Sequence, residues 1–394
     1  MPISDNIRSA QFVDTYYPHI DGVVEVIHNY TVRMNKNGYA CVVAPKAAAP
    51  FDDARLPYDV FRTSSFSPKS WQYSVSYPVN LKEPVNIALK SRPDILHVHS
   101  PFTIRSCALK IAKRMEIPLV ATFHTKYYDD VFRITKSRAV AKAVVANIVG
   151  FYNQCDSVWA CSEGTKNTLI EYGFKGHIDV MINGTEFKIP DDTESLKAIA
   201  KRNFHITDDK KNILFVGTQV WQKNMRLVLD TMKVLSKDNI QYRLYVAGSG
   251  YDEEKIHEYA AQLNLTRDQV AFLGKVTDRN LLTGLYLNAD LFFFPSMYDN
   301  SPLVLREASF AQVPSLLVKG SNAAEVIIPD VNGFVAEQSP AKMAAKIRSV
   351  IRDEELLKRC GREAARTIPV SWDDIVPKVL EEYKIIIEKH KRRR

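Results

Sequence analysis

The chain has 394 residues, 46% of them hydrophobic and 25% charged, and this length suggests about two to three folded domains. The ordinary composition, without a low-complexity stretch, excludes a disordered chain. No apolar run reaches the ~18–20 residues that cross a bilayer, and the opening MPISDNIRSAQF lacks the pattern of a signal peptide. We therefore predict a cytoplasmic protein. Its five cysteines are scattered without a CxxC pair, so we expect reduced thiols.

The net charge is +8, and the basic excess lies in the first half of the chain and in the final KHKRRR. Such a surface can serve solubility alone, or it can meet an anionic partner such as nucleic acid or a membrane. The chain contains no recognised nucleic-acid-binding module, and its basic residues are not interleaved with stacking aromatic residues. Nucleic acid is therefore not an expected partner.

Short apolar runs alternate with amphipathic segments in the first half of the chain. Strands are predicted at 9–14, 41–45, 95–99, 119–124, 157–161 and 179–183, with helices at 23–37, 103–115 and 139–154. This alternation is typical of a parallel sheet that is covered by helices on both faces.

The pattern then restarts. Strands are predicted at 212–217, 242–248, 270–274, 291–295 and 315–318, separated by helices at 225–235, 253–263, 278–288, 302–310 and 340–352. The predicted fold is α/β, with two doubly wound Rossmann-like domains facing each other across a cleft. The domain bounds are 1–187 and 188–374, because the stretch around 185–190 is polar and rich in turn residues.

The C-terminal segment 375–394 is predicted to be a helix that packs back on the first domain. Ser371 suits its N-cap, with Asp374 at the third helical position. An apolar stripe at helical spacing follows and consists of Val376, Leu380, Tyr383 and Ile387. The basic end beyond this stripe is expected to protrude.

Ligands of doubly wound sheets bind at the carboxyl ends of the strands, so the residues after each strand are the first candidates. Gly22 precedes a helix whose start favours an anion, and His124 ends a strand where it can donate a hydrogen bond to a substrate. Taken alone, a tight turn and a structural histidine are the simpler interpretations. His97 and His99 lack a third ligand at zinc-like spacing, so no metal is expected.

Gly217 and Lys223 follow the strand at 212–217, and a glycine turn, a lysine and a helix start together suit a phosphate. Neither GxxxxGK[ST] nor GxGxxG occurs, so a P-loop enzyme and a dinucleotide-dependent dehydrogenase are unsupported.

The segment from Pro295 to Glu307 carries the sharpest signal. An apolar strand ends at Pro295, and a helix whose first turn suits Pro302 contains Glu307. The polar loop between them holds Asp299, Asn300 and Ser301. Amides at the helix start can bind a diphosphate, and the acids on either side can accept hydrogen bonds from sugar or ribose hydroxyls.

Together these motifs resemble glycosyltransferase family four, whose members have the GT-B fold and are retaining. The likeness covers nearly the whole chain in the right order. It rests on YPHIDGVV (17–24), DILHVHSPF (94–102), FHT (123–125), NGTEF (183–187), FVG with Lys223, GSG (248–250), FLGKVTD (272–278), the segment 295–308 and VNGFV (331–335). In appearance the chain is closest to bacterial diacylglycerol glucosyltransferases.

The resemblance implies a role for each matching residue. Gly22 would face the donor phosphates, His124 would lie beside the donor sugar, Lys223 would bind the diphosphate and Glu307 the ribose. Asp299 would contact sugar hydroxyls and act with His124 in catalysis. The remaining donor-binding residues would be Gly217, Val276, Asn300, Ser301, Leu303 and Val304.

Two positions depart from the family pattern. Asp299 stands where the family usually has glutamate, and it is one methylene shorter. Thr218 stands where the family usually has arginine, and the loss of a charged partner costs a donor oxygen ~1.5–3 kcal/mol unless another cation compensates.

The stretch after His124 resembles the lipid-glycosylating members most closely. Lys126, Tyr127, Arg133, Lys136 and Arg138 are assigned to the acceptor or membrane side. A basic, partly apolar helix at 133–151 could lie on anionic headgroups at the inner face of the cell membrane, or it could be an ordinary surface helix.

The resemblance implies transfer of a hexose, with glucose favoured, from a UDP-sugar to an acceptor hydroxyl on a lipid such as diacylglycerol or on a glycan, without a cofactor or metal. Two alternatives stay open. One is a GDP-mannose-dependent or cell-wall glycosyltransferase, and the other is a non-catalytic protein that binds nucleotide-sugars.

Overall fold

A computed structural model describes residues 6–46, 49–66, 75–76, 86–87, 90–185, 191–238 and 242–393, and it divides into two compact units. Unit 1 comprises Met1–Gly184 and Ser371–Arg394, and unit 2 comprises Thr185–Val370. The chain thus changes unit at 184/185 and 370/371, where the sequence suggested 187/188 and 374/375. The suggested boundary at 187/188 lies outside the described residues, as do Glu186 and Phe187 of the NGTEF motif.

Unit 1 is built on a seven-stranded sheet in the order β3-β2-β1-β6-β7-β8-β9, and all of its pairs are parallel. The strands are β1 (Arg8–Phe12), β2 (Tyr39–Pro45), β3 (Val60–Thr63), β6 (Ile95–Val98), β7 (Leu119–Phe123), β8 (Ser157–Ala160) and β9 (Asp179–Val180). A separate antiparallel pair joins β4 (Ser65–Phe66) to β5 (Val75–Ser76). The strand order reverses between β1 and β6, which places the topological switch point there.

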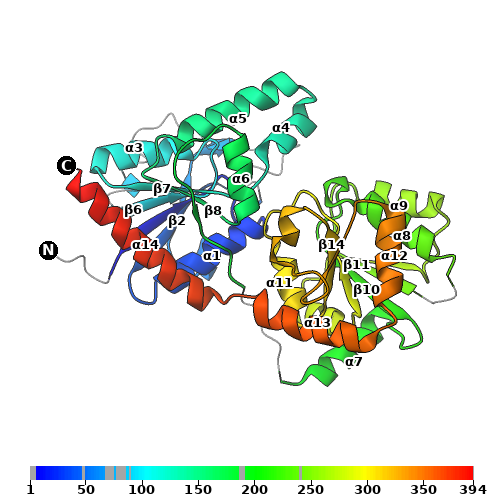
Figure 1. Ribbon diagram of the computed structural model, residues 1–394. Helices are drawn as coiled ribbons and strands as arrows, with labels where there is room; N and C mark the ends of the chain where they lie inside the picture. Colours follow the sequence, from blue (N-terminus) through cyan, green and yellow to red (C-terminus); the bar gives the residue numbers. More distant parts are fainter. Residues whose placement is uncertain are drawn as a thin grey trace. The chain divides into compact units, whose positions relative to one another are not determined.

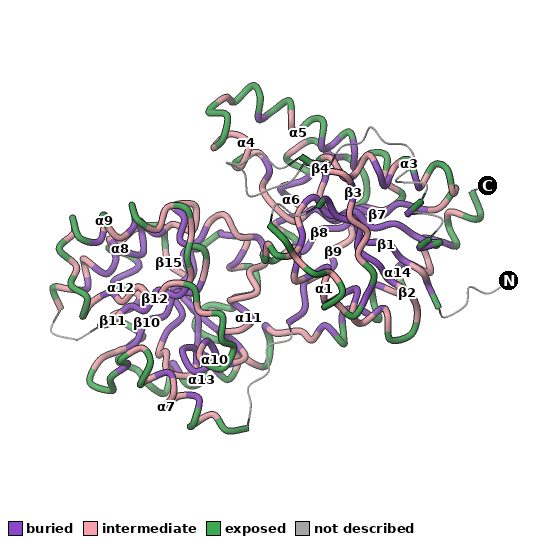
Figure 2. Tube along the Cα trace, turned by 180° about the vertical axis from the view of Figure 1, so that it is seen from behind, coloured by how far each residue is buried: buried purple, intermediate pink, exposed green. Residues whose placement is uncertain are grey.

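The central strands are buried because they are apolar on both faces, and Figure 2 shows them in purple beneath the helices. The covering helices of unit 1 are α1 (Gly22–Met34), α3 (Arg105–Met115), α4 (Tyr127–Thr135), α5 (Arg138–Tyr152), α6 (Glu163–Glu171) and α14 (Trp372–Arg392), with the short η1 (Asp53–Arg55).

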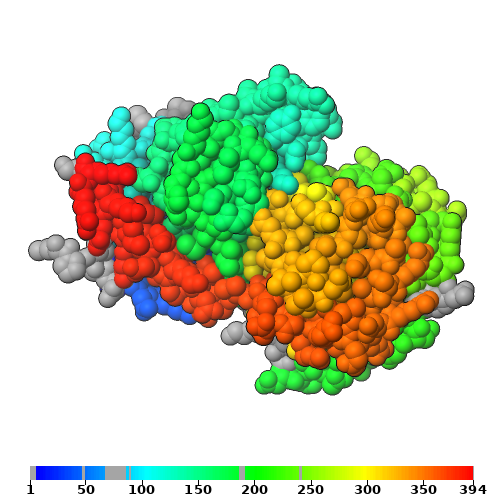
Figure 3. All heavy atoms as spheres, viewed as in Figure 1, coloured from blue at the N-terminus to red at the C-terminus, as the bar shows by residue number. Residues whose placement is uncertain are grey.

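The C-terminal helix α14 packs beside α1, as Figure 1 shows in red and blue, and its outer face lies at the surface in Figure 3. Ser371 is its N-cap and accepts a hydrogen bond from the Asp373 amide at 3.1 Å. The basic end forms the last turn of this helix, which continues to Arg392, and Lys389, Lys391 and Arg392 are exposed there. His390 Nδ1 lies 3.0 Å from Asp156 Oδ1.

The predicted single helix at 133–151 is wrong, because two helices cover this stretch. Helix α4 ends at Thr135, and Lys136 adopts a left-handed conformation with φ of 54°. Ser137 then caps α5, since its Oγ accepts a hydrogen bond from the Val140 amide at 3.4 Å. A serine before an apolar periodic segment is a typical N-cap signal, so the break was present in the sequence.

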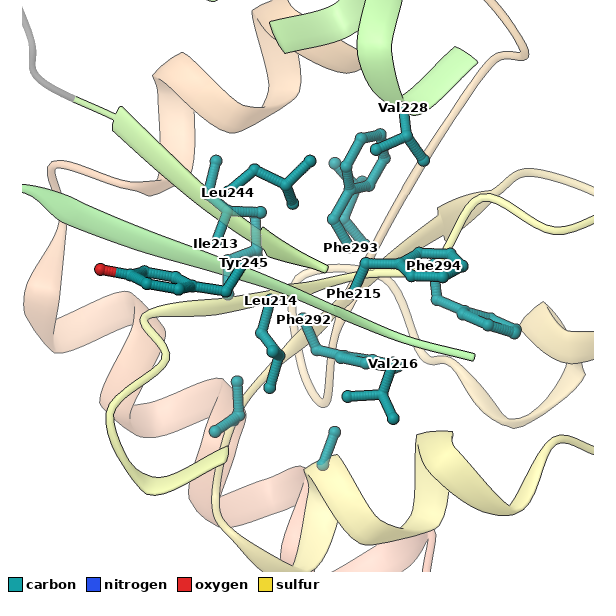
Figure 4. Packing of buried hydrophobic residues seen from close by; sticks show 14 of the residues in the cluster. Ile213, Leu214, Phe215, Val216, Val228, Leu244, Tyr245, Phe292, Phe293 and Phe294 are labelled. Atoms are coloured by element: carbon teal, nitrogen blue, oxygen red, sulfur yellow. The ribbon is translucent and has the colours of Figure 1, made fainter. Parts of the chain in front are cut away.

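Unit 2 contains a six-stranded parallel sheet in the order β12-β11-β10-β13-β14-β15. Its strands are β10 (Lys211–Val216), β11 (Tyr242–Ala247), β12 (Val270–Gly274), β13 (Leu291–Phe293), β14 (Ser315–Val318) and β15 (Phe334–Ala336). Figure 4 shows the apolar side chains of β10, β11 and β13 packed together at its centre. The order reverses between β10 and β13, so the loops after these two strands flank the switch point.

The helices of unit 2 are α7 (Thr193–Phe204), α8 (Met225–Leu235), α9 (Glu253–Gln262), α10 (Arg279–Leu287), α11 (Leu303–Phe310), α12 (Pro340–Val350) and α13 (Glu354–Thr367), with η2 (Trp221–Lys223) and η3 (Asn322–Val326). Helix α7 lies in a stretch for which the sequence analysis predicted neither a helix nor a strand. It packs against α10, where its buried Leu196 and Ala200 contribute the contacts that fix a helix in this position.

Candidate active site

Two glycines allow the loops after β10 and β11 to touch at the carboxyl edge of the unit 2 sheet. Gly248 has a φ of +134°, and a Cβ there would lie 1.9 Å from the Gly217 carbonyl oxygen. A Cβ on Gly250 would lie 2.4 Å from the carbonyl oxygen of Gln219. The buried Gln219 amide donates to the Gly248 carbonyl at 2.7 Å. Any side chain at either glycine would therefore push the two loops apart.

Lys223 lies at the end of η2 and forms an ion pair with Asp299, which follows β13. Both side chains are largely buried, with 16% and 15% of their surfaces exposed. The Lys223 ammonium also lies 5.8 Å from the ring centre of Phe294 and 5.7 Å from that of Tyr298. The structure thus brings together two predicted site residues that are 76 positions apart in the chain.

The backbone around this pair is held by side chains from both loops. Asn224 has a left-handed φ of 62°, and its amide donates to the Pro295 carbonyl at 3.0 Å. The Ser296 hydroxyl accepts from the Tyr298 and Asp299 amides at 3.2 and 3.3 Å. The loops on either side of the switch point are therefore tied to each other.

Only one carboxylate oxygen of Asp299 is satisfied. Oδ1 accepts from Lys223, while Oδ2 is buried without a hydrogen-bond partner among the described residues. A buried carboxylate oxygen without a donor is costly, so a hydroxyl that reached Oδ2 would remove this cost.

Glu307 on α11 is held at both oxygens and is 12% exposed. Oε1 lies 3.0 Å from the Arg279 guanidinium, and Oε2 accepts from the Tyr286 hydroxyl at 3.0 Å. Burial, followed by the charge of Glu307, raises the pKa of Tyr286 well above its usual value. Tyr286 therefore keeps its proton and remains a hydrogen-bond donor to the carboxylate.

Helix α11 begins at Leu303 without a side-chain cap, because Pro302 holds the N-cap position. Among the residues that the structure describes, no side chain caps the first amides of the helix, those of Leu303 and Val304. Two side-chain hydrogen bonds hold the loop before α11. Asn300 Oδ1 accepts from Asn322 at 2.7 Å, and Ser301 Oγ accepts from Arg306 at 3.3 Å.

The other predicted donor residues lie at the same edge of the sheet. Gly217 directly follows β10 and is half-buried, while Thr218 beside it is exposed. Val276 is half-buried and comes two residues after Gly274, whose φ is +66°. Thr218 is uncharged, so Lys223 is the cation of the segment that follows β10, residues 217–224.

In unit 1, three histidines line the carboxyl ends of β6 and β7. His99 Nδ1 lies 3.0 Å from His124 Nε2, and His99 Nε2 lies 2.9 Å from Gln11 Oε1. His97 contacts the Tyr383 hydroxyl at 2.6 Å and the Thr122 hydroxyl at 2.7 Å. Burial lowers the pKa of His124 to about 4. It is therefore neutral at pH 7.

Gly22 begins α1, but the start of this helix already holds a carboxylate. Asp21 is the N-cap, and its Oδ1 accepts from the Val23 and Val24 amides at 2.9 Å each. A Cβ on Gly22 would meet no atom within 4 Å, so packing does not require glycine there. Its role toward a phosphate stays a prediction.

The residues assigned to the acceptor side separate into a buried and a surface group. Tyr127 is 5% exposed and packs against the rings of Phe102 and Phe123, so it belongs to the core and not to the surface. The other four lie around α4 and α5, and they are Lys126, Arg133, Lys136 and Arg138.

The sequence did not single out two exposed apolar side chains at the corner between α4 and α5. Ile134 is 68% exposed and Val140 is 44% exposed. Because Arg133, Lys136 and Arg138 lie between or beside them in the chain, basic and apolar groups alternate at this corner. Figure 3 shows the corner at the surface of unit 1, near the top in teal.

The described part of the chain contains no helix long and apolar enough to span a membrane. It likewise contains no group of three or more His, Cys, Asp or Glu residues that could hold a metal ion.

Two Rossmann-like units with these strand orders define the GT-B class of glycosyltransferase folds. The sucrose-phosphate synthase of Thermosynechococcus elongatus is similar, with a TM-score of 0.79 at 15% identity, covering 98% of this chain and 100% of that one. Anabaena HepE, solved with UDP and glucose, has a TM-score of 0.76 at 15% identity, covering 96% and 99%. These likenesses confirm the predicted fold class.

Two family models match the chain, one over most of unit 1 and the other over most of unit 2, and the chain passes from one unit to the other at 184/185. "Glycosyltransferase Family 4" matches residues 20–188, and "Glycosyl transferases group 1" matches residues 197–367. The chain therefore belongs to the family 4 glycosyltransferases, as its motifs suggested, and it is an enzyme of that class.

Curated relatives extend this result. The alpha-monoglucosyldiacylglycerol synthase of Streptococcus pneumoniae is 26% identical over 323 residues, which is 78% of this chain and 70% of the relative. The GDP-mannose-dependent alpha-mannosyltransferase of Corynebacterium glutamicum is 21% identical over 394 residues, covering 98% of this chain and 91% of the relative.

Proposed function

We propose that the protein is a retaining glycosyltransferase that moves a hexose, glucose in the first instance, from a UDP-sugar to a lipid hydroxyl such as that of diacylglycerol. The observation that carries this proposal is the Lys223–Asp299 pair at the switch point of unit 2, beside the uncapped start of α11 and Glu307. The cation and the uncapped amides suit the diphosphate of a nucleotide-sugar, Asp299 suits its sugar, and Glu307 suits its ribose.

The diphosphate would bind to Lys223 and to the first amides of α11. An ammonium and the positive end of a helix both stabilise an anion, and the departing nucleoside diphosphate gains negative charge as the glycosidic bond breaks. Thr218 supplies no second charge, so the whole cationic contribution of this loop rests on Lys223.

The ribose would bind to Glu307. Its carboxylate is already oriented by Tyr286, and its other partner, Arg279, has a 65% exposed side chain. Exposed ion pairs contribute little to stability, so a ribose hydroxyl can replace Arg279 at low cost. The hydrogen bond to Tyr286 would remain and fix the carboxylate.

The hexose would bind to Asp299, whose Oδ2 lacks a donor. A sugar hydroxyl would satisfy this oxygen, while the ion pair with Lys223 holds the carboxylate in place. Because aspartate is one methylene shorter than the family's usual glutamate, the hydroxyl must approach closer to the backbone of the loop. For His124 we keep the role that the resemblance implies, a contact with the donor sugar.

The acceptor side would lie on unit 1, and the corner between α4 and α5 would attach the protein peripherally to the inner face of the cell membrane. Exposed Ile134 and Val140 can enter the headgroup region, while the basic side chains around them meet anionic lipids. Diacylglycerol-glycosylating relatives from Streptococcus pneumoniae and Acholeplasma laidlawii support a lipid acceptor.

A GDP-mannose donor is the second candidate, and it is favoured by the likeness to the Corynebacterium mannosyltransferase over the whole chain. Isothermal titration calorimetry with UDP-glucose, UDP and GDP-mannose separates the two. The proposal expects the two uridine ligands to bind and GDP-mannose to bind more weakly. Tighter binding of GDP-mannose would identify GDP-mannose as the donor in place of UDP-glucose. If none of the three ligands bound at millimolar concentration, the proposal would be overturned. Binding without turnover would support a non-catalytic nucleotide-sugar-binding protein.

A further inference from the structure

Arg279, the first residue of α10, contacts the carboxylate that the proposed function assigns to the ribose of the donor. Its Nη1 lies 3.0 Å from Glu307 Oε1. We propose that Arg279 is an internal competitor of the donor. In the ligand-free protein it occupies the oxygen of Glu307 that a ribose hydroxyl needs, so the nucleotide must displace the guanidinium in order to bind. This inference rests on the proposed function and adds a control of affinity to it.

The Glu307 carboxylate stays in place when Arg279 leaves, because its other oxygen is held from the interior of unit 2. Oε2 accepts from the Tyr286 hydroxyl at 3.0 Å, and Tyr286 is fully buried. The Glu307 side chain itself is only 12% exposed. A carboxylate with so little access to water is stabilised by a partner at each oxygen. Arg279 is that partner at Oε1 in the empty site, and a ribose hydroxyl would take its place in the complex.

The position of Arg279 does not suit a mainly structural role. A cation at the first position of a helix meets the positive end of the helix dipole, which is unfavourable. The side chain is also 65% exposed, so it buries little surface. Among the described residues its guanidinium pairs with Glu307, and such an exposed ion pair adds little to stability. We therefore expect its main effect on the ligand that needs Glu307.

Displacement of Arg279 requires only that its side chain rotates. The backbone at the start of α10 is fixed by Asp278, whose Oδ1 accepts from the Asn280 and Leu281 amides at 2.8 and 3.1 Å. Helix α10 is tied to α11 by Tyr286 and not by Arg279 alone, since the Tyr286 hydroxyl also lies 3.4 Å from the Val304 carbonyl oxygen. The contact between the two helices therefore remains when the ion pair opens.

The expected size of the effect follows from the weakness of an exposed ion pair. Such a pair is favoured over its open state by roughly 1.4- to 5-fold, so Glu307 is open for roughly 15–40% of the time. The apparent Kd of a ligand rises by the inverse of the fraction of protein that can bind it. Arg279 should therefore raise the Kd of a nucleotide that needs Glu307 by roughly 2- to 6-fold.

Two ligands of equal charge, UDP and its dideoxy analogue without the ribose hydroxyls, give the clearest comparison. UDP needs Glu307, whereas dideoxy-UDP leaves the ion pair intact. Isothermal titration calorimetry with the full-length protein gives both Kd values. In Arg279→Met we expect the ratio of the Kd for dideoxy-UDP to the Kd for UDP to be roughly 2- to 6-fold higher than in the native protein. The loss of a cation weakens both diphosphates alike, so this effect cancels in the ratio.

Three controls separate competition from a general effect of charge. Arg267→Met removes an exposed arginine that lies before β12, at the other end of that strand from Arg279, and should leave the ratio unchanged. Arg279→Met should also leave it unchanged in a Glu307→Gln background, because an uncharged amide does not hold the guanidinium. In the native protein, added salt should move the ratio toward that of Arg279→Met, since salt weakens exposed ion pairs.

The inference and the proposed function fail separately. A ratio that is unchanged or lower in folded Arg279→Met would overturn the competition, and so would an equal rise of the ratio in the Glu307→Gln background. In both cases UDP binding by the native protein would leave the proposed function intact. If the native protein did not bind UDP at millimolar concentration, the proposed function would be overturned and this inference with it.

Discussion

The ion pair between Lys223 and Asp299 has two effects that mutations can separate. Both side chains are about 85% buried, the complements of 16% and 15% exposure. In Lys223→Met the Asp299 carboxylate stays in place without its cation. We expect the free energy of unfolding to fall by about 1–3 kcal/mol, the cost of leaving a buried polar group unsatisfied.

The same substitution removes the proposed diphosphate cation. A hydrogen bond to a charged group contributes about 1.5–3 kcal/mol, which corresponds to a roughly 10- to 150-fold rise in the Kd for UDP. Isothermal titration calorimetry gives this Kd, and urea unfolding gives the stability of the same samples.

The double variant Lys223→Met/Asp299→Asn distinguishes the two effects. The neutral amide no longer needs a cation, so we expect most of the lost stability to return while UDP affinity stays low. Asp299→Asn alone keeps the ammonium and should retain UDP affinity while losing hexose transfer. Normal UDP binding by folded Lys223→Met, or recovered affinity in the double variant, would refute the reasoning.

Three further predictions follow from other contacts. Glu307→Gln keeps the hydrogen bond from Tyr286 but lacks the charge, and calorimetry should show UDP affinity reduced by about 10-fold or more; unchanged affinity would remove Glu307 from the ribose site. The lowered pKa of His124, about 4 against an ordinary 6.5, means that its contribution to stability is present above pH 6.5 and is lost as pH falls toward 4. His124→Asn should therefore reduce the pH dependence of urea unfolding in that window, although the lowered pKa values of buried His97 and His99 maintain part of it; an unchanged slope would contradict the assignment. Ile134→Ser combined with Lys136→Glu should reduce sedimentation with anionic vesicles while leaving UDP affinity intact; equal sedimentation of the variant would exclude this corner as the attachment point.

The sequence was sufficient for most of the fold because buried parallel strands are apolar on both faces. The strands that flank the switch point of unit 2 were recognisable as NILFVG and LFFFP. Helix α7 was not, since it buries only Leu196 and Ala200 between polar residues and gains its stability from packing on α10. Two helices were predicted over the stretch around Lys136, one at 139–154 and one at 133–151, and α5 (Arg138–Tyr152) agrees with the first.

The candidate site was predictable residue by residue but not as a set of contacts. Lys223 and Asp299 were placed on separate loops, and only their positions in the folded sheet pair them. No pattern in the sequence predicted that Arg279 would form an ion pair with Glu307. The hydrogen bond between Gln11 and Tyr383 joins residues 372 positions apart, and no local pattern predicts such a contact.

The central claim is that this chain transfers a hexose from a nucleotide-sugar with retention of configuration. Incubating the protein with UDP-glucose and diacylglycerol-containing anionic vesicles, followed by proton NMR of the extracted lipid, tests it most directly. The account predicts a glucosylated lipid with the α-anomeric configuration of the donor. A product with the β configuration would contradict retention, and absence of any glycosylated product from UDP-glucose or GDP-mannose would contradict the transfer itself.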